Sequence, residues 1–238
     1  MSNALKPNRR KAIFLAKKSI AQIVTDVVNL EDINYTVPEV QTLLDGITVG
    51  GHKLQDELIV LNQIKAWRFL FESLDSGTFE WSKDFLYKLH SLVAYQEALE
   101  WGKFRTGMVS ISGTSYLPPL SIDLDNLWEK FLITVNSNFG EKQLILTDRD
   151  GLHYYEGAIF VFAEMSRTQF FYDGNKRTAR MMMSGILLDA GYPMINIPAS
   201  RKHEFNQIMI EYYETQDLVK LSGFLFSCID TWLIDEFV

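Results

Sequence analysis

The sequence predicts an all-α fold, a helical bundle with one short β-hairpin, and three observations support this. Over most of the 238 residues, apolar side chains recur three and four positions apart, as on the buried face of an amphipathic helix. One segment, residues 108–117, instead alternates β-branched and polar residues around the turn-prone pair Ser112-Gly113, as a hairpin does. The composition, 47% apolar and 22% charged, is ordinary for a globular protein with a buried core.

The expected helices follow from the apolar spacing and from residues that favour helix ends. A short helix starts at Val37-Pro38, where proline suits the first turn, and Gly46 ends it. Serines are well placed to cap three of the longer helices, and Gly191 is placed to end another. The longer helices are expected over residues 8–28, 54–74, 83–99, 122–136, 150–168, 175–190, 201–215 and 217–236.

No linker rich in proline, glycine or serine divides the chain. We therefore expect residues 51–238 to form one helical domain, and residues 1–50 to form an N-terminal helical arm. Basic residues flank an apolar run at 12–16, which is too short for a signal peptide. This pattern is typical of an amphipathic helix with a basic face, and local contact with an acidic partner or with nucleic acid is the alternative.

Charge and cysteine content narrow the function classes. The net charge is −7, so a surface that generally coats nucleic acid is not expected. The single cysteine, Cys228, lies in an apolar stretch, where we expect it to be part of the core, and it allows no internal disulfide. No run approaches the roughly 18 apolar residues that a membrane span needs. These features predict a cytoplasmic protein without a membrane partner.

Residues 168–180 are the most informative stretch for chemistry. Asp173-Gly174-Asn175 is a tight turn that leads into a helix with Lys176 and Arg177 in its first turn. The N–H groups at a helix start lack internal partners and favour an anion such as phosphate. Arg180 lies on the same helix face as Arg177, and Asp173 beside a phosphate is a natural Mg²⁺ ligand. The alternative is a capped helix with a cationic surface.

This stretch is similar to the motif of Fic-domain proteins, His-x-Phe-x-Asp/Glu-Gly-Asn-Gly/Lys-Arg-x-x-Arg. The matching positions are Phe171, Asp173, Gly174, Asn175, Lys176, Arg177 and Arg180. The segment from Gly102 through Gly113 to Pro119 resembles the Fic flap hairpin and its approach. The resemblance covers roughly residues 40–215, and it implies a compact helical bundle, in agreement with the apolar spacing.

The resemblance implies a function and a role for each residue. Many Fic proteins transfer AMP from ATP to a hydroxyl side chain of a target protein. In this account the nucleotide, ATP or another nucleoside triphosphate, is bound by Gly174, Asn175, Lys176, Arg177 and Arg180, and Asp173 holds Mg²⁺. Arg180 is placed on the pyrophosphate side. The flap residues that align the target protein are Ser110, Ile111, Ser112, Gly113 and Thr114. A homo-oligomer is a further open possibility.

One position departs from the family pattern, because Gln169 stands where the family has its histidine. That histidine takes the proton from the attacking hydroxyl, whereas a carboxamide has no suitable pKa and only orients a hydroxyl by hydrogen bonding. None of the four histidines offers an obvious replacement in the sequence, and His90 is expected to be a satisfied or surface histidine. Two hypotheses stay open: a transferase that Gln169 slows, and a catalytically silent nucleotide- or phosphate-binding or regulatory module.

A second comparison concerns regulation. Many Fic proteins carry an inhibitory helix with a Ser/Thr-x-x-x-Glu-Gly/Asn pattern, whose glutamate pairs with the last arginine of the motif. Here Gln41-Thr-Leu-Leu-Asp45-Gly46 lies in a comparable place, with Asp45 in place of the glutamate. The alternative is a plain helix C-terminus that Gly46 ends.

Overall fold

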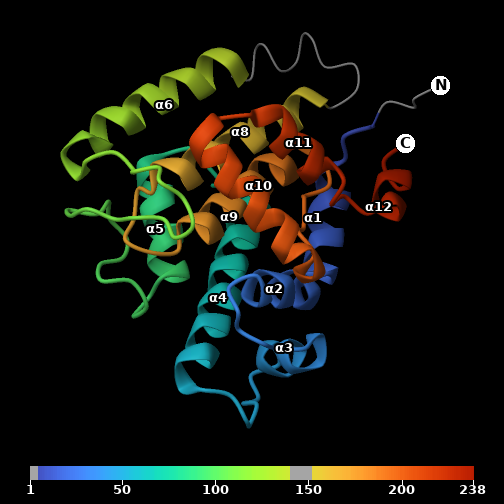
Figure 1. Ribbon diagram of the computed structural model, residues 1–238. Helices are drawn as coiled ribbons and strands as arrows, with labels where there is room; N and C mark the ends of the chain where they lie inside the picture. The colour runs from blue at the N-terminus through green and yellow to red at the C-terminus, as the bar shows by residue number, and fades with distance from the viewer. Residues whose placement is uncertain (1–4, 140–151) are drawn as a thin grey trace.

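The computed structural model describes residues 5–139 and 152–238, and it confirms the all-α fold: no strand is present in these two ranges. The chain runs through the helices in sequence order (Figure 1). The first half contains α1 (Arg9–Lys18), α2 (Ile20–Asn29), α3 (Val37–Leu44), α4 (Leu54–Ser76), α5 (Lys83–Val93), the 3₁₀ turn η1 (Ser121–Asp123) and α6 (Leu124–Phe139). The second half contains α8 (Leu152–Thr168), α9 (Asn175–Ala190), η2 (Ala199–Arg201), α10 (Lys202–Thr215), α11 (Leu218–Phe226) and α12 (Thr231–Asp235).

Helix α9 lies at the centre of the bundle and packs against α1, α4, α5 and α8. It is buried on nearly every side, including the run Met181-Met182-Met183, as expected for a helix that is surrounded by others. A side chain at Gly185 would collide with the ring of Phe79, so close packing also requires this glycine. The beginning of α9, where the motif lies, is therefore held by the core.

Three expected helices differ from the structure by more than a few residues at an end or are divided in two. The helix is interrupted at Ser19, so residues 8–28 form α1 and α2 rather than one helix. Both contact α4, but α1 also packs on α9, whereas α2 packs on α3. Helix α5 ends at Val93 instead of 99, because the chain turns and Gln96 takes a left-handed conformation. The last helix is broken between α11 and α12. The expected start of α8 at residues 150–151 lies outside the described residues.

The predicted hairpin at 108–117 has its turn but not its strands. Gly113 takes φ +86° at the turn, which glycine adopts readily. The two arms, which lie within the described residues, form no backbone hydrogen bonds with each other, and the segment contacts α10 instead. The Thr114 hydroxyl donates to Glu214 at 2.9 Å, and a Cβ at Gly113 would meet Ile210 at 3.0 Å. We call residues 108–117 the flap.

The N-terminal helices share the core of the rest of the chain, although the division at residue 50 stays a prediction. The basic residues of α1 bind acidic residues elsewhere: Arg9 pairs with Asp189, and Lys17 with Asp75. These pairs attach α1 to the bundle and account for part of its basic face. Residues 1–4 of the arm lie outside the described ranges.

Two sequence-based expectations concern single features. Cys228 is buried, and burial raises the pKa of its thiol to about 11, in agreement with a place in the core. Among the described helices, none has the length and apolar content to cross a bilayer.

Candidate functional site

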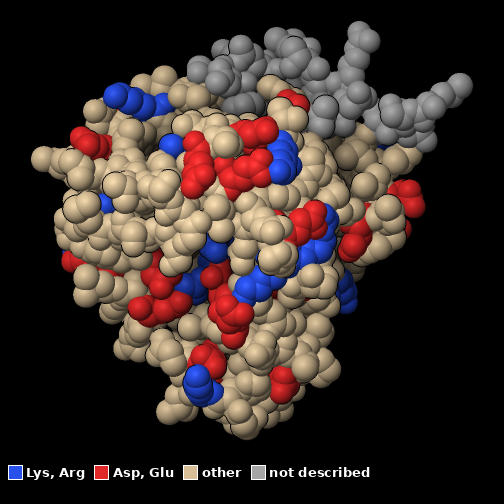
Figure 2. Space-filling model, viewed as in Figure 1, with Lys and Arg blue, Asp and Glu red and all other residues tan. Residues whose placement is uncertain are grey.

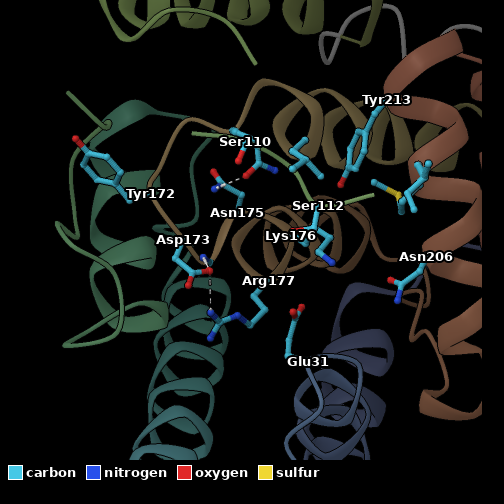
Figure 3. A pocket seen from close by; sticks show the side chains of 15 residues that line it. Glu31, Ser110, Ser112, Tyr172, Asp173, Asn175, Lys176, Arg177, Asn206 and Tyr213 are labelled. Carbon is cyan, nitrogen blue, oxygen red and sulfur yellow. Dashed lines mark hydrogen bonds and ion pairs between the residues drawn. The ribbon is translucent and has the colours of Figure 1, made fainter. Parts of the chain in front are cut away.

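A pocket of about 470 Å³ opens at the beginning of α9 (Figure 3). Five parts of the chain line it: the turn between α8 and α9, the first turn of α9, the flap, α10, and Glu31 just after α2. Nine of the residues predicted from the sequence are brought together there, namely Ser110, Ile111, Ser112, Gln169, Asp173, Gly174, Asn175, Lys176 and Arg177. Arg180, Gly113 and Thr114 do not line it.

The turn before α9 has a backbone that favours anion binding. Gly174 takes φ +69°, and a Cβ there would press on Val93 and Ala94 at 3.3 Å, so glycine is required. The Asp173 carboxylate accepts from the Gly174 N–H at 2.6 Å. The N–H groups of the next three residues, 175–177, have no partner within the described ranges. They carry the positive end of the α9 dipole toward the pocket.

His90 fixes the backbone of this turn by hydrogen bonds. Its Nδ1 accepts from the Gly102 N–H at 3.0 Å, so Nε2 carries the proton and donates to the Asp173 carbonyl at 3.0 Å. The ring stacks on Phe171 with centroids 3.6 Å apart. Burial lowers the pKa of His90 to about 4, which keeps the ring neutral at pH 7. His90 is thus a satisfied structural histidine, as predicted.

The side chain of Asn175 points inward and fixes the turn. Its Oδ1 accepts from the Phe171 N–H at 2.9 Å, and its Nδ2 donates to the Phe171 carbonyl at 2.8 Å. Nδ2 also donates to Gln169 Oε1 at 3.0 Å. The carboxamide of Asn175 is therefore occupied by the turn, and what this residue offers an anion is its backbone N–H.

Gln169 lies on the pocket wall in a strained conformation. Its φ is +52°, which is uncommon for a residue other than glycine. Its Nε2 donates to the Ser166 carbonyl at 2.6 Å, and its Oε1 accepts from Asn175. The carboxamide is thus oriented by two hydrogen bonds, and neither of its atoms has a pKa suited to taking a proton.

Arg177 is engaged by a carboxylate that the sequence analysis did not identify. Its Nη1 donates to Glu97 Oε2 at 2.8 Å, and its Nη2 donates to the other oxygen of the same carboxylate. Asp173 lies 3.6 Å from the same guanidinium. The side chains of Arg177 and Glu97 are only 4% and 12% exposed. Burial alone would lower the pKa of Arg177, but the hydrogen bonds to Glu97 and the nearby carboxylates together raise it.

Arg180 also has a carboxylate neighbour, and it is Glu31 rather than Asp45. Arg180 Nη2 lies 3.3 Å from Glu31 Oε1, while its Nε and Nη1 have no hydrogen-bond partner in the described structure. Burial lowers the pKa of Arg180 to about 10, so it stays protonated at pH 7. Asp45 instead accepts from Gln41 at 3.0 Å, at the end of α3 that Gly46 follows. Asp45 therefore does not pair with Arg180 in this structure, and an inhibitory role for Asp45 and Gly46 stays a prediction.

Lys176 is the cation at the pocket that has no ion pair within the described ranges. Around it, Arg177 and Arg180 face the carboxylates of Glu97 and Glu31. The nearby cations keep the pKa of Glu31 below its usual range in spite of burial, so this carboxylate is charged. Figure 2 shows acidic and basic side chains next to each other on this face, rather than one broad basic field. The site is locally balanced in charge.

Asp173 suits the predicted Mg²⁺ site only as one ligand among several. Its side chain is more than half exposed at the pocket, and one of its oxygens already accepts from Gly174. No group of three or more potential metal ligands occurs among the described residues. The chain thus supplies one carboxylate here, which suits Mg²⁺ that is completed by phosphate oxygens and water.

Comparison with known proteins agrees with this geometry. The model of the Fic/DOC family matches residues 80–187, a range that contains the turn, the flap and most of α9. The chain contains a Fic/DOC-family domain. The resemblance stated from the sequence is thereby confirmed, and the Fic domain here carries Gln169 where the motif has histidine.

Related proteins and structures extend the likeness beyond the domain. The proteins named "Protein adenylyltransferase Fic" of Drosophila mojavensis and Drosophila persimilis are 24% and 25% identical over 205 residues, 86% of this chain and 37% of theirs. This chain thus spans little more than a third of those relatives.

Three solved structures share the fold. A Fic domain containing signaling protein from Bacteroides thetaiotaomicron aligns with a TM-score of 0.76 at 20% identity, over 98% of this chain and 88% of that one. Fic-1 from C. elegans gives 0.75 at 19%, over 93% of this chain and 62% of that one. BepC protein from Bartonella tribocorum, with bound AMPPNP, gives 0.50 at 15%, over 70% and 85%.

Proposed function

We propose that this chain binds a nucleoside triphosphate, ATP above all, in the pocket at the beginning of α9, and that its Fic-type AMP transfer to a protein hydroxyl is slowed by Gln169. The observation that carries the proposal is the convergence of free N–H groups, Lys176 and Asp173 on one pocket beneath the flap. The adenylyltransferase names of the relatives and the AMPPNP in a related structure support ATP as the nucleotide.

Different residues of the pocket bind the phosphates, the Mg²⁺ ion and the target protein. The N–H groups of residues 175–177 and the ammonium of Lys176 face phosphate oxygens, to which both donate. Asp173 would hold Mg²⁺ together with those oxygens, and the ion would supply charge neutralisation of the phosphates. The flap, whose arms do not pair with each other, presents backbone groups that an extended segment of a target protein can pair with.

Gln169 determines the rate of transfer in this account. The hydroxyl oxygen of the target forms a bond to the α-phosphorus, the bond from that phosphorus to the bridging oxygen breaks, and pyrophosphate leaves. The hydroxyl proton must pass to a base, and the carboxamide of Gln169 accepts none, so water has to take it. Loss of a general base lowers a rate by about 10²- to 10⁴-fold.

A second candidate function is a silent nucleotide- or phosphate-binding module. The observation that favours it is the pairing of both motif arginines with carboxylates, Arg177 with Glu97 and Arg180 with Glu31. The two functions differ in the wild type: a slowed transferase labels protein weakly from ATP, whereas a silent module labels none. Gln169→His then tests whether position 169 alone limits transfer. The target protein, a homo-oligomer and a cytoplasmic location stay predictions.

Calorimetric titration with ATP and Mg²⁺ tests the binding step. Lys176→Ala removes a cation from the pocket without breaking an ion pair among the described residues. We expect affinity to fall by about tenfold or more, as for a lost charge-assisted hydrogen bond. The control is Lys65→Ala, which removes an exposed lysine from α4. Equal affinity of the Lys176→Ala protein and the wild type would contradict the assignment.

A further inference from the structure

Arg105 connects the flap to the turn before α9. It is 2% exposed, and three of its N–H groups donate to backbone carbonyls. Nε donates to Gln169 at 2.7 Å, Nη1 to Gly107 at 2.7 Å and Nη2 to Pro119 at 2.6 Å. Its own backbone N–H donates to the Phe170 carbonyl at 2.9 Å. One residue thus contacts both sides of the flap and the residue that replaces the family histidine.

The guanidinium is charged and buried without an acidic partner in the described part of the chain. Burial lowers the pKa of Arg105, although the group stays protonated. Three carbonyl dipoles therefore stabilise the charge in place of a carboxylate. A planar group with several N–H donors in a fixed fork can reach three carbonyls at once, whereas the ammonium of lysine is a compact point charge.

The three carbonyl groups that accept from Arg105 lie before the flap, after the flap and at Gln169. Gly107 directly precedes the flap and Pro119 lies two residues after it, so their shared contact with Arg105 closes the flap at its base. Gln169 is the third partner, and its strained backbone at φ +52° lies on the pocket wall. A single side chain thus sets the separation between the base of the flap and the backbone of Gln169.

We propose that Arg105 is a positioning residue that fixes the flap against the backbone of Gln169. It holds the segment that would carry the target hydroxyl at a set distance from position 169. The inference rests on the proposed function only in the role given to the flap, because the contacts themselves do not depend on nucleotide binding.

Nuclear magnetic resonance of the full chain tests the proposal with two readouts. The first is the order parameter of the flap amides 108–117, and the second is the side-chain amide resonance of Gln169. In Arg105→Gln we expect flap order parameters to fall from about 0.85 to below about 0.6, and the Gln169 resonance to shift. Arg105→Lys keeps the charge but not the fork, so we expect an intermediate fall.

Arg68→Gln is the matched control, because Arg68 also donates to a carbonyl, that of Leu44, outside the flap and the turn. It should leave both readouts unchanged. If Arg105→Gln does not fold, the Arg105→Lys protein decides. A rigid flap and an unmoved Gln169 resonance in the folded variant would overturn the proposal. Failure of the wild type to bind ATP would count against the proposed function alone.

Discussion

Glu97 accepts hydrogen bonds from both terminal nitrogens of Arg177, and the pair lies almost wholly out of the solvent. Glu97 comes from the turn after α5, 80 residues before its partner. The pair therefore joins that turn to the beginning of α9. It also means that one of the two motif arginines is neutralised where a phosphate is expected to bind.

Removal of Glu97 should destabilise the fold. Glu97→Ala leaves a buried guanidinium without its carboxylate, and breaking a buried pair in this way costs about 3 kcal/mol. Urea unfolding measures the change in free energy. Glu211→Ala removes the partner of Lys220 from an exposed pair and should cost less than about 1 kcal/mol. If both substitutions cost the same, Glu97 is no more than a surface contact.

Glu31 should oppose nucleotide binding. Its carboxylate lines the pocket beside Arg180 and is charged at pH 7, so it repels phosphate. Glu31→Gln removes this charge with little change in shape, and we expect ATP with Mg²⁺ to bind about tenfold more tightly, a change of about 1.4 kcal/mol. Titration calorimetry measures the affinity.

The matched control for Glu31 is Asp45→Asn, because Asp45 was the carboxylate that sequence similarity placed near Arg180. The structure places it against Gln41, so its neutralisation should leave affinity unchanged. Tighter binding in Asp45→Asn and not in Glu31→Gln would reverse this assignment.

His90 should make stability depend on pH. Its folded-state pKa, about 4, is below the ordinary value of 6.5, so the unfolded chain binds the proton first as pH falls. The contribution is fully present above pH 6.5 and is lost progressively down to about pH 4, for a total of about 3 kcal/mol. Urea unfolding across this range should show a shallower loss in His90→Gln than in the wild type.

The exposed His203 provides the comparison for that experiment. His203→Gln should keep the pH dependence of the wild type. Parallel stability curves for the wild type and His90→Gln would show that His90 takes up its proton in the folded state as readily as in the unfolded chain.

The sequence predicts the parts of the site that lie close together along the chain. Gly174, Asn175 and Lys176 form one continuous turn, and the need for glycine at φ +69° is local. Glu31 and Glu97 were missed because nothing in the residues around them marks an arginine partner. The packing of α2 and α5 on their neighbours brings Glu31 to Arg180 and Glu97 to Arg177. No spacing in the sequence marks such a contact.

The fold, like the site, was predicted where the signal is local along the chain and missed where contacts between distant segments decide. The central helix α9 was predicted with correct ends because Gly191, at φ +90°, stops it locally. The bend at Ser19 was missed because one nearly helical residue leaves the apolar spacing of 8–28 almost intact. The alternation in the flap suggested paired strands, whereas Thr114 and Gly113 are held by α10. Alternation of apolar and polar residues indicates which side chains are buried, but not whether the segment pairs with another strand.

The most direct measurement is transfer of label from ATP with a radiolabelled α-phosphate to proteins of a cell lysate, by the wild type and Gln169→His. Histidine tolerates a left-handed backbone better than most residues, so the variant should accept φ +52° at position 169. A base at this position should raise labelling by about 10²-fold or more, and Gln169→Ala should not. A Gln169→His protein that folds, binds ATP with Mg²⁺ and labels no more than the wild type would contradict the account.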